Sequence, residues 1–201
     1  MHASVTTMDV DLADLAPERL RRFTGREFDE MCKHGILSGP EHVELLDGVL
    51  VAMNGQEEPH ARVSAWFAQV LIRALDFDAY DVRSHSTFAP SESSRPEPDI
   101  AVFRRNRSLA TLPSQALLLV EVAHSSLRKD RVIKVPLYAA CGVPEYWIVD
   151  VHASAVEVYT GPTPTGYARA AIYRTSDALR PVALPGIAIA VADIPFRPAA
   201  P

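Results

Sequence analysis

The sequence predicts an α/β fold of the α+β type, in which a mixed β-sheet is flanked by helices and preceded by an N-terminal hairpin. Three observations support this prediction. Segments with helical and strand patterns follow the order helix, hairpin, helix, several strands, helix, several strands. The run ALLLVEV at residues 116–122 has the continuous apolar character of a strand buried on both faces. The chain has 201 residues, 48% of them hydrophobic, which is enough for one well-buried core.

The N-terminal part of the chain predicts a helix and then a tight hairpin. Thr24 and Glu27 have the spacing of a capping box, so we expect a helix to begin there. In HVELLDGVLVAM, at residues 42–53, two β-rich runs flank Asp47-Gly48, a pair that favours a two-residue hairpin turn. Glu44 is therefore expected on the first strand of a hairpin.

The central part predicts a long helix followed by the first strands of the sheet. Apolar residues recur with helical spacing in residues 58–75, and Pro59 suits the first turn of that helix. Residues 79–89 alternate like a half-buried strand, and a segment rich in Ser, Pro and Arg separates them from the strand at residues 99–103. The apolar run at residues 116–122 then gives the central strand.

The C-terminal part predicts one more helix and four short strands. Residues 125–142 have a helical pattern that ends at Gly142, although Pro136 lies inside it and is expected to remove a hydrogen bond or kink the helix. Strand patterns follow at residues 144–150, 155–160, 166–173 and 186–194. Tyr146 and Trp147 alternate along the first of these strands, so we interpret them as core aromatics and not as a base-stacking surface.

We expect a single domain over residues 21–197, preceded by a flexible tail over residues 1–20. The tail contains three aspartates and lacks the basic segment and apolar run of a secretory signal. No segment approaches the roughly 18 apolar residues that a membrane-spanning helix requires. Two cysteines cannot form a disulfide framework or a four-ligand zinc site. These features favour a cytoplasmic protein without a membrane partner.

Two carboxylates occur on apolar strands, Asp99 in PEPDIAVF and Glu121 in LLLVEVAHSS. An ionised carboxylate is costly to bury without a partner, and two that converge repel each other unless a cation lies between them. A hard divalent ion with oxygen ligands would meet that need. The alternative is that Glu121 lies past the buried part of its strand and that Asp99 is a turn residue after Pro98.

Several motifs together resemble one nuclease family. The order and spacing of four motifs are similar to those of the PD-(D/E)XK nuclease superfamily, and in particular of the bacterial Uma family of restriction-endonuclease-like proteins. The motifs are PDIAVF, LLLVEVAHSS, a lysine at position 134 and YAACGVPEYWIVD. HVELLDGVLV and PHARV match the N-terminal half of that family, so the resemblance covers residues 23–159. It implies a restriction-endonuclease-like fold.

The resemblance also implies a site and its chemistry. It places Asp99 and Glu121 as ligands of Mg²⁺ or Mn²⁺, together with the backbone carbonyl of Val122, and adds Glu44 as a further acidic group or ligand. Lys134 would be the catalytic lysine that orients or deprotonates the attacking water. The implied reaction is metal-dependent endonucleolytic hydrolysis of DNA, with DNA as partner and a homodimer as the assembly. The alternative function is a non-catalytic module with a nuclease fold that serves dimerisation or nucleic-acid binding, and the net charge of −5 favours it slightly.

The lysine departs from the usual superfamily pattern. That pattern has a lysine two residues after the glutamate, where this chain has Ala123. The resemblance therefore places the catalytic lysine at Lys134 on the following helix, and Lys129 is the alternative. Alternatively, Asp130 and Lys134 form an exposed i,i+4 ion pair. Of the 20 basic residues only three are lysines, Lys33 being the third. A lysine where the chain otherwise uses arginine favours a catalytic role, because the pKa of lysine is lower than that of arginine. We expect Lys134→Met to change stability little.

His60 also matches a histidine of the family. The resemblance does not imply a role for it. The alternative to a functional role is that His60 is a surface residue near the N-terminus of the helix at residues 58–75.

Overall fold

The computed structural model describes residues 21–37, 42–53, 55, 57–106 and 111–196. The predicted tail, residues 1–20, lies outside the described residues. None of the described helices is long and apolar enough to cross a membrane.

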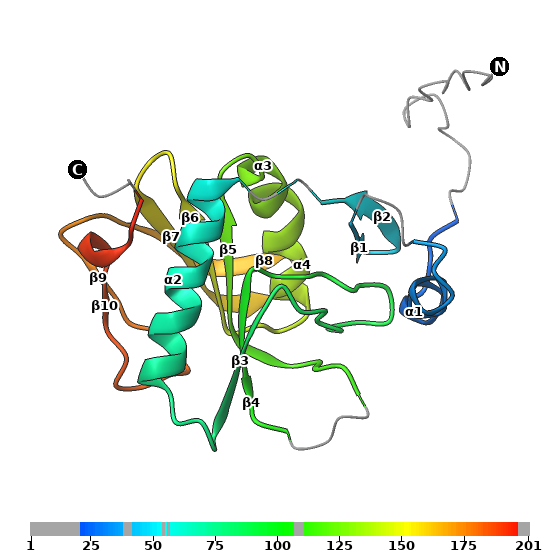
Figure 1. Cartoon of the computed structure of the whole chain (residues 1–201), viewed down its shortest axis with the longest axis horizontal. Coiled ribbons are helices and arrows are strands. Elements are labelled where there is room, and N and C mark those ends of the chain that lie inside the picture. The colour runs from blue at the N-terminus through cyan, green and yellow to red at the C-terminus, as the bar shows by residue number, and fades with distance from the viewer. Residues whose placement is uncertain (1–20, 38–41, 54, 56, 107–110, 197–201) are drawn as a thin grey trace.

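A six-stranded mixed sheet forms the centre of the molecule, in the order β3-β4-β5-β6-β7-β8 (Figure 1). Its strands are β3 (Tyr80–Ser84), β4 (Ile100–Arg104), β5 (Ala116–Ala123), β6 (Glu145–Asp150), β7 (Ala155–Thr163) and β8 (Gly166–Tyr173). Strands β5 and β6 are parallel, and every other neighbouring pair is antiparallel. The helical segment between β5 and β6 makes the crossover that a parallel pair requires. The prediction of a mixed sheet flanked by helices is confirmed.

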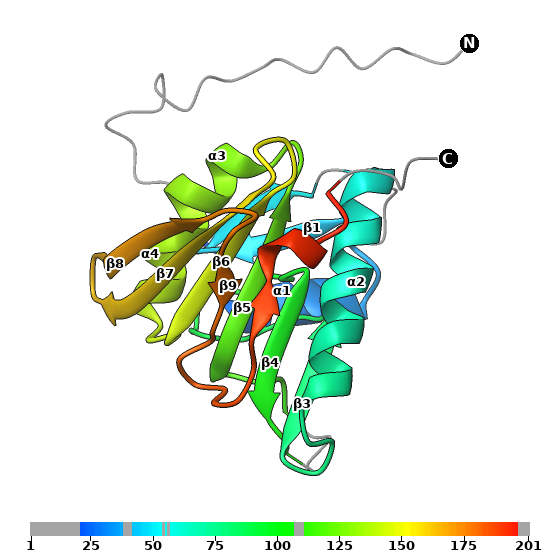
Figure 2. The same ribbon diagram turned by 90° about the vertical axis from the view of Figure 1, so that its left-hand side faces the viewer.

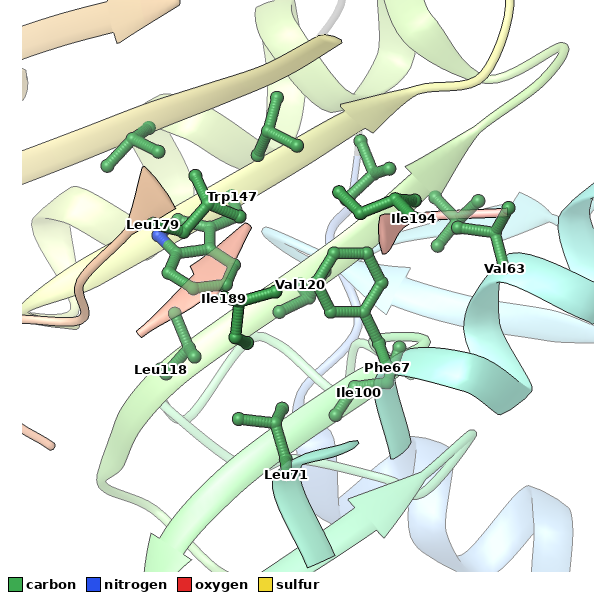
Figure 3. Packing of buried hydrophobic residues seen from close by; sticks show 14 of the residues in the cluster. Val63, Phe67, Leu71, Ile100, Leu118, Val120, Trp147, Leu179, Ile189 and Ile194 are labelled. Carbon is green, nitrogen blue, oxygen red and sulfur yellow. The ribbon is translucent and has the colours of Figure 1, made fainter. Parts of the chain in front are cut away.

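Helix α2 (Glu58–Ala74) covers one face of this sheet (Figure 2). The short strands β9 (Ala178–Leu179) and β10 (Ile189–Ala190) and the 3-10 turn η3 (Val191–Asp193) pack on the same face. Figure 3 shows how Phe67 and Leu71 of α2 meet Val120 of β5 and Trp147 of β6 in the main hydrophobic core. These strand residues alternate with others that face the opposite side, as the two-residue period of a strand requires.

The other face of the sheet carries the helical crossover: α3 (Leu127–Lys129), the π-helical turn η2 (Asp130–Lys134) and α4 (Val135–Ala140). The second core cluster lies here and includes Tyr138 of α4 and Tyr146 of β6. Tyr146 and Trp147 are both fully buried, as predicted, and they point into the two different cores.

The predicted single helix over residues 125–142 is thus interrupted by a π turn. Pro136 has no backbone N–H, and in a regular α-helix its ring would collide with the carbonyl of the residue four positions earlier. In the π turn directly before it, the N–H of Val135 bonds to the carbonyl of Asp130, five residues back. This wider turn accommodates the proline, and it carries Lys134. Helix α4 ends at Ala140, and Gly142, the glycine predicted to close it, lies just beyond with φ +73.

The N-terminal elements agree closely with the sequence patterns. Helix α1 (Gly25–Lys33) begins with the expected capping box between Thr24 and Glu27. Strands β1 (Val43–Leu46) and β2 (Val49–Ala52) form the hairpin, with Asp47 and Gly48 at φ +47 and +78. The hairpin docks on the loop before β4 through paired backbone bonds between Leu45 and Arg95.

Two strand predictions were too long. The strand predicted over residues 79–89 ends at Ser84, because His85 adopts a positive φ of 46°. Of the strand predicted over residues 186–194, only Ile189–Ala190 forms β10, and the chain then turns into η3.

Candidate metal and active site

Strand register places Asp99 beside Glu121. Ile100 of β4 lies opposite Val120 of β5 in an antiparallel pair, so the next positions along the two chains are Asp99 and Glu121. Asp99 itself lies one residue before β4. Both side chains are on the face that carries α3, η2 and α4, because the residues two positions away, Ala101 and Leu119, belong to that core.

Asp99 is held by one of its carboxylate oxygens. Oδ2 accepts hydrogen bonds from the backbone N–H of Val122 at 2.7 Å and from Nε2 of His60 at 3.0 Å. Nδ1 of His85 lies 3.4 Å from the other oxygen, Oδ1. His60 is therefore not a surface residue: its side chain is only 14% exposed, and it contacts Asp99. The alternative that Asp99 is merely a turn residue does not account for these contacts.

The carbonyl of Val122 shares the side of β5 on which Asp99 lies, because the N–H and C=O of one strand residue point the same way. Its role as a metal ligand stays a prediction.

Glu121 is also held by one oxygen. Its Oε1 accepts hydrogen bonds from Nζ of Lys134 at 2.8 Å and from the hydroxyl of Tyr138 at 3.0 Å. The residue is 4% exposed, so the alternative that it lies past the buried part of β5 is wrong. Its buried carboxylate has the partners that such a group requires.

Glu44 reaches the same cluster from the hairpin. It is fully buried, with Oε2 3.2 Å from Nζ of Lys134 and Oε1 2.9 Å from Nζ of Lys129. Lys134 therefore bridges Glu44 and Glu121, whereas Lys129 contacts Glu44 and keeps a partly exposed side chain. The four predicted residues Glu44, Asp99, Glu121 and Lys134 come together although they span ninety positions of the sequence.

Asp130 is a fourth buried carboxylate in this region. Its Oδ2 accepts a hydrogen bond from the hydroxyl of Ser126, and its Oδ1 has no hydrogen-bond partner among the described residues. Asp130 and Lys134 are 1% and 2% exposed, so the alternative of an exposed ion pair between them is wrong.

The charges of the cluster explain how its groups titrate. Burial disfavours the charged form of Lys134, but the carboxylates of Glu121, Glu44 and Asp130 outweigh burial and raise its pKa. Burial raises the pKa of Glu121 to about 8; Lys134 opposes that shift, and the charges of Asp99, Asp130 and Glu44 add to it. Lys134 is therefore an ammonium at neutral pH.

A cavity of about 50 Å³ opens beside these groups. This volume holds a water molecule or a small cation, since one water needs roughly 10–15 Å³ on this measure. Its lining comes from the segment after β2, the start of α2, the segment before β4, the end of β5 and the helical segment that follows β5. It includes His60, Asp99, Glu121, His124 and Lys129.

The donor chemistry of the cluster suits a divalent ion. Four buried carboxyl groups face two lysines, and Asp130 presents an oxygen without a hydrogen-bond partner among the described residues. Oxygen donors are those that Mg²⁺ and Mn²⁺ prefer. No three His, Cys, Asp or Glu side chains among the described residues already form a ready set of ligands. Mg²⁺ is commonly held by only one or two carboxylates and keeps several waters, so two carboxylates are sufficient.

Sequence patterns missed Tyr138 and the burial of Asp130. Both lie four residues from Lys134, so Asp130, Lys134 and Tyr138 follow one face of the helical segment. That face is the buried one. The signal was a row of polar residues at i,i+4 spacing on a helix that must pack against an apolar sheet.

Comparison with known families agrees with this geometry. The model of the family Uma2, described as "Putative restriction endonuclease", matches residues 26–192. The chain belongs to this family. A search of curated proteins gives no match.

The fold of this Uma2 protein is similar to that of a solved crystal structure. The crystal structure described as that of "a putative nuclease belonging to DUF820 from Anabaena variabilis" superposes on this chain with a TM-score of 0.62. The alignment covers 79% of this chain and 94% of the other, at 16% sequence identity. This likeness concerns the fold, and the Uma2 match supports nuclease function.

Proposed function

We propose that this Uma2 protein is a Mg²⁺- or Mn²⁺-dependent endonuclease that hydrolyses phosphodiester bonds of DNA. The observation that carries the proposal is the convergence of Asp99, Glu121 and Lys134 beside a small cavity, with more buried carboxylates than lysines around it. Membership of the family supports a nuclease, and the residue roles are our inference.

In this proposal each residue has a distinct task. Asp99 and Glu121 hold the ion, with the carbonyl of Val122 as a further ligand. When bound, the ion polarises the phosphate and lowers the pKa of the attacking water. Lys134 places a positive charge where negative charge develops on the phosphate. It acts as an ammonium and not as a base, because the surrounding carboxylates raise its pKa.

Glu44 has a supporting task. It bonds both Lys134 and Lys129, so it fixes the lysines at the edge of the cavity. The net charge of −5 does not oppose the proposal, since the ion and the two lysines supply local positive charge for the phosphate.

The test is cleavage of supercoiled plasmid DNA by the purified protein with Mg²⁺, with Mn²⁺ and with EDTA. We expect nicking or cutting with either metal and none with EDTA. Asp99→Asn should be slower by a factor of at least about a hundred, since it removes a ligand charge. Asp150→Asn is the matched control. Asp150 is equally buried at the neighbouring end of β6, and its carboxylate accepts a hydrogen bond from the local backbone N–H of Ala153.

Three outcomes would change the proposal. Equal activity of Asp99→Asn and wild type would remove the assigned site. Cleavage of RNA alone would replace DNA as substrate. No cleavage of DNA or RNA with either metal would favour the non-catalytic interaction module.

A further inference from the structure

Helix α4 brings a second hydrogen-bond donor to the candidate metal ligand Glu121. Lys134 and Tyr138 lie four residues apart, so they project from one face of the helical segment towards β5. Nζ of Lys134 and the hydroxyl of Tyr138 donate to the same oxygen of Glu121, Oε1, at 2.8 and 3.0 Å.

Two donors on one carboxylate oxygen determine how the other oxygen is used. A carboxylate has about four acceptor positions, two on each oxygen, so Oε1 is saturated by its two donors. Oε2 remains for other partners, and Glu121 lines the cavity. The orientation of the carboxylate thus depends on the two donors that hold Oε1.

We propose that Tyr138 is a positioning residue for the metal site: its hydroxyl, with Lys134, fixes Oε1 of Glu121 and so presents Oε2 to the divalent ion. The inference rests on the proposed function and deepens it, since it assigns a role outside the ligands themselves. Partners that orient a metal ligand in this way typically contribute a factor of about 10–100 in metal affinity or activity.

Packing alone does not require the hydroxyl. The ring of Tyr138 is fully buried and lies edge-on to Tyr146 with centroids 5.0 Å apart, and it packs near Phe88 at 6.5 Å. A phenylalanine ring fills the same space. Tyr146 offers the contrast, because its hydroxyl is buried in the same cluster and has no hydrogen-bond partner among the described residues.

The experiment compares Tyr138→Phe with Tyr146→Phe in the full chain. Each variant removes one buried hydroxyl from the same aromatic cluster, and only the first removes a bond to Glu121. Mn²⁺ binding is measured by calorimetric titration, and folding is checked by circular dichroism and thermal unfolding. We expect Tyr138→Phe to weaken Mn²⁺ binding at least about tenfold. Tyr146→Phe should bind like the wild type.

A merely structural role would lower thermal stability and leave the Mn²⁺ dissociation constant unchanged, which would overturn the inference. Equal weakening by both variants would also overturn it, because the effect would then come from the cluster and not from the bond. A Tyr138→Phe protein that does not fold would show a structural hydroxyl, with the same consequence. If the wild type itself binds no Mn²⁺, the proposed metal site fails, and that result is distinct from failure of the tyrosine alone.

Discussion

Removing the amine of Lys134 should destabilise the protein strongly. On an exposed helix, Lys134→Met would cost little, and that was the expectation from the sequence. Lys134 is instead 2% exposed and bridges two buried carboxylates, at 2.8 Å from Glu121 and 3.2 Å from Glu44. Breaking a buried ion pair by removing one partner costs about 3–5 kcal/mol. Glu44 keeps Lys129 and Glu121 keeps Tyr138, so we expect a value near the lower end, about 3 kcal/mol.

Urea unfolding at pH 7 measures this cost. With a slope of about 1–3 kcal/mol per molar urea, the midpoint should fall by about 1–3 M. Lys129→Met is the control and should cost only about 1–2 kcal/mol, because its side chain is partly exposed and Glu44 keeps Lys134. A midpoint of Lys134→Met equal to that of the wild type would refute the reasoning.

Three further predictions concern the dependence of stability on pH, stabilisation by Mn²⁺ and the hydrogen bond between His60 and Asp99. The pKa of Glu121 is raised from an ordinary 4.5 to about 8 in the folded protein. Between these values the folded protein holds a proton that the unfolded chain releases, so the free energy of unfolding should fall as pH rises from about 5 through 8. The slope should be flatter in Glu121→Gln; an identical slope in urea unfolding would contradict the assignment. Mn²⁺ at a hundred times its dissociation constant should stabilise the wild type by about 2.7 kcal/mol in thermal unfolding. Asp99→Asn should lose this stabilisation, and an Asp99→Asn protein that Mn²⁺ still stabilises would exclude Asp99 as a ligand. His60→Leu should weaken Mn²⁺ binding about tenfold in calorimetry, whereas His60→Gln, which keeps a donor for Asp99, should weaken it less; the reverse order would rule out that hydrogen bond as the cause.

The elements that sequence patterns predicted well are those fixed by local chemistry. The capping box at Thr24, the Asp47-Gly48 turn and the end of a helix at Gly142 each depend on neighbouring residues alone. The apolar run of β5 was equally clear, because a strand buried on both faces leaves no alternation to interpret.

The site was harder to predict because its geometry depends on distant elements. The register of β4 and β5 sets Asp99 beside Glu121, and only docking of the hairpin brings Glu44 to Lys134. Lys134 is buried within the π turn before Pro136, and no single-residue preference specifies such a turn. For the same reason the sequence could not show that the pKa of this lysine is raised.

The account depends most directly on a divalent ion between Asp99 and Glu121, and a crystal soaked in Mn²⁺ tests it. Anomalous diffraction should give a peak within about 2.0–2.4 Å of one oxygen from each carboxylate, consistent with oxygen ligation of such ions. The oxygens should be Oδ1 of Asp99 and Oε2 of Glu121, because Oδ2 and Oε1 each accept two hydrogen bonds, whereas the contact of Oδ1 with Nδ1 of His85 is longer, at 3.4 Å. A crystal at saturating Mn²⁺ with no anomalous peak at this position would contradict the central claim.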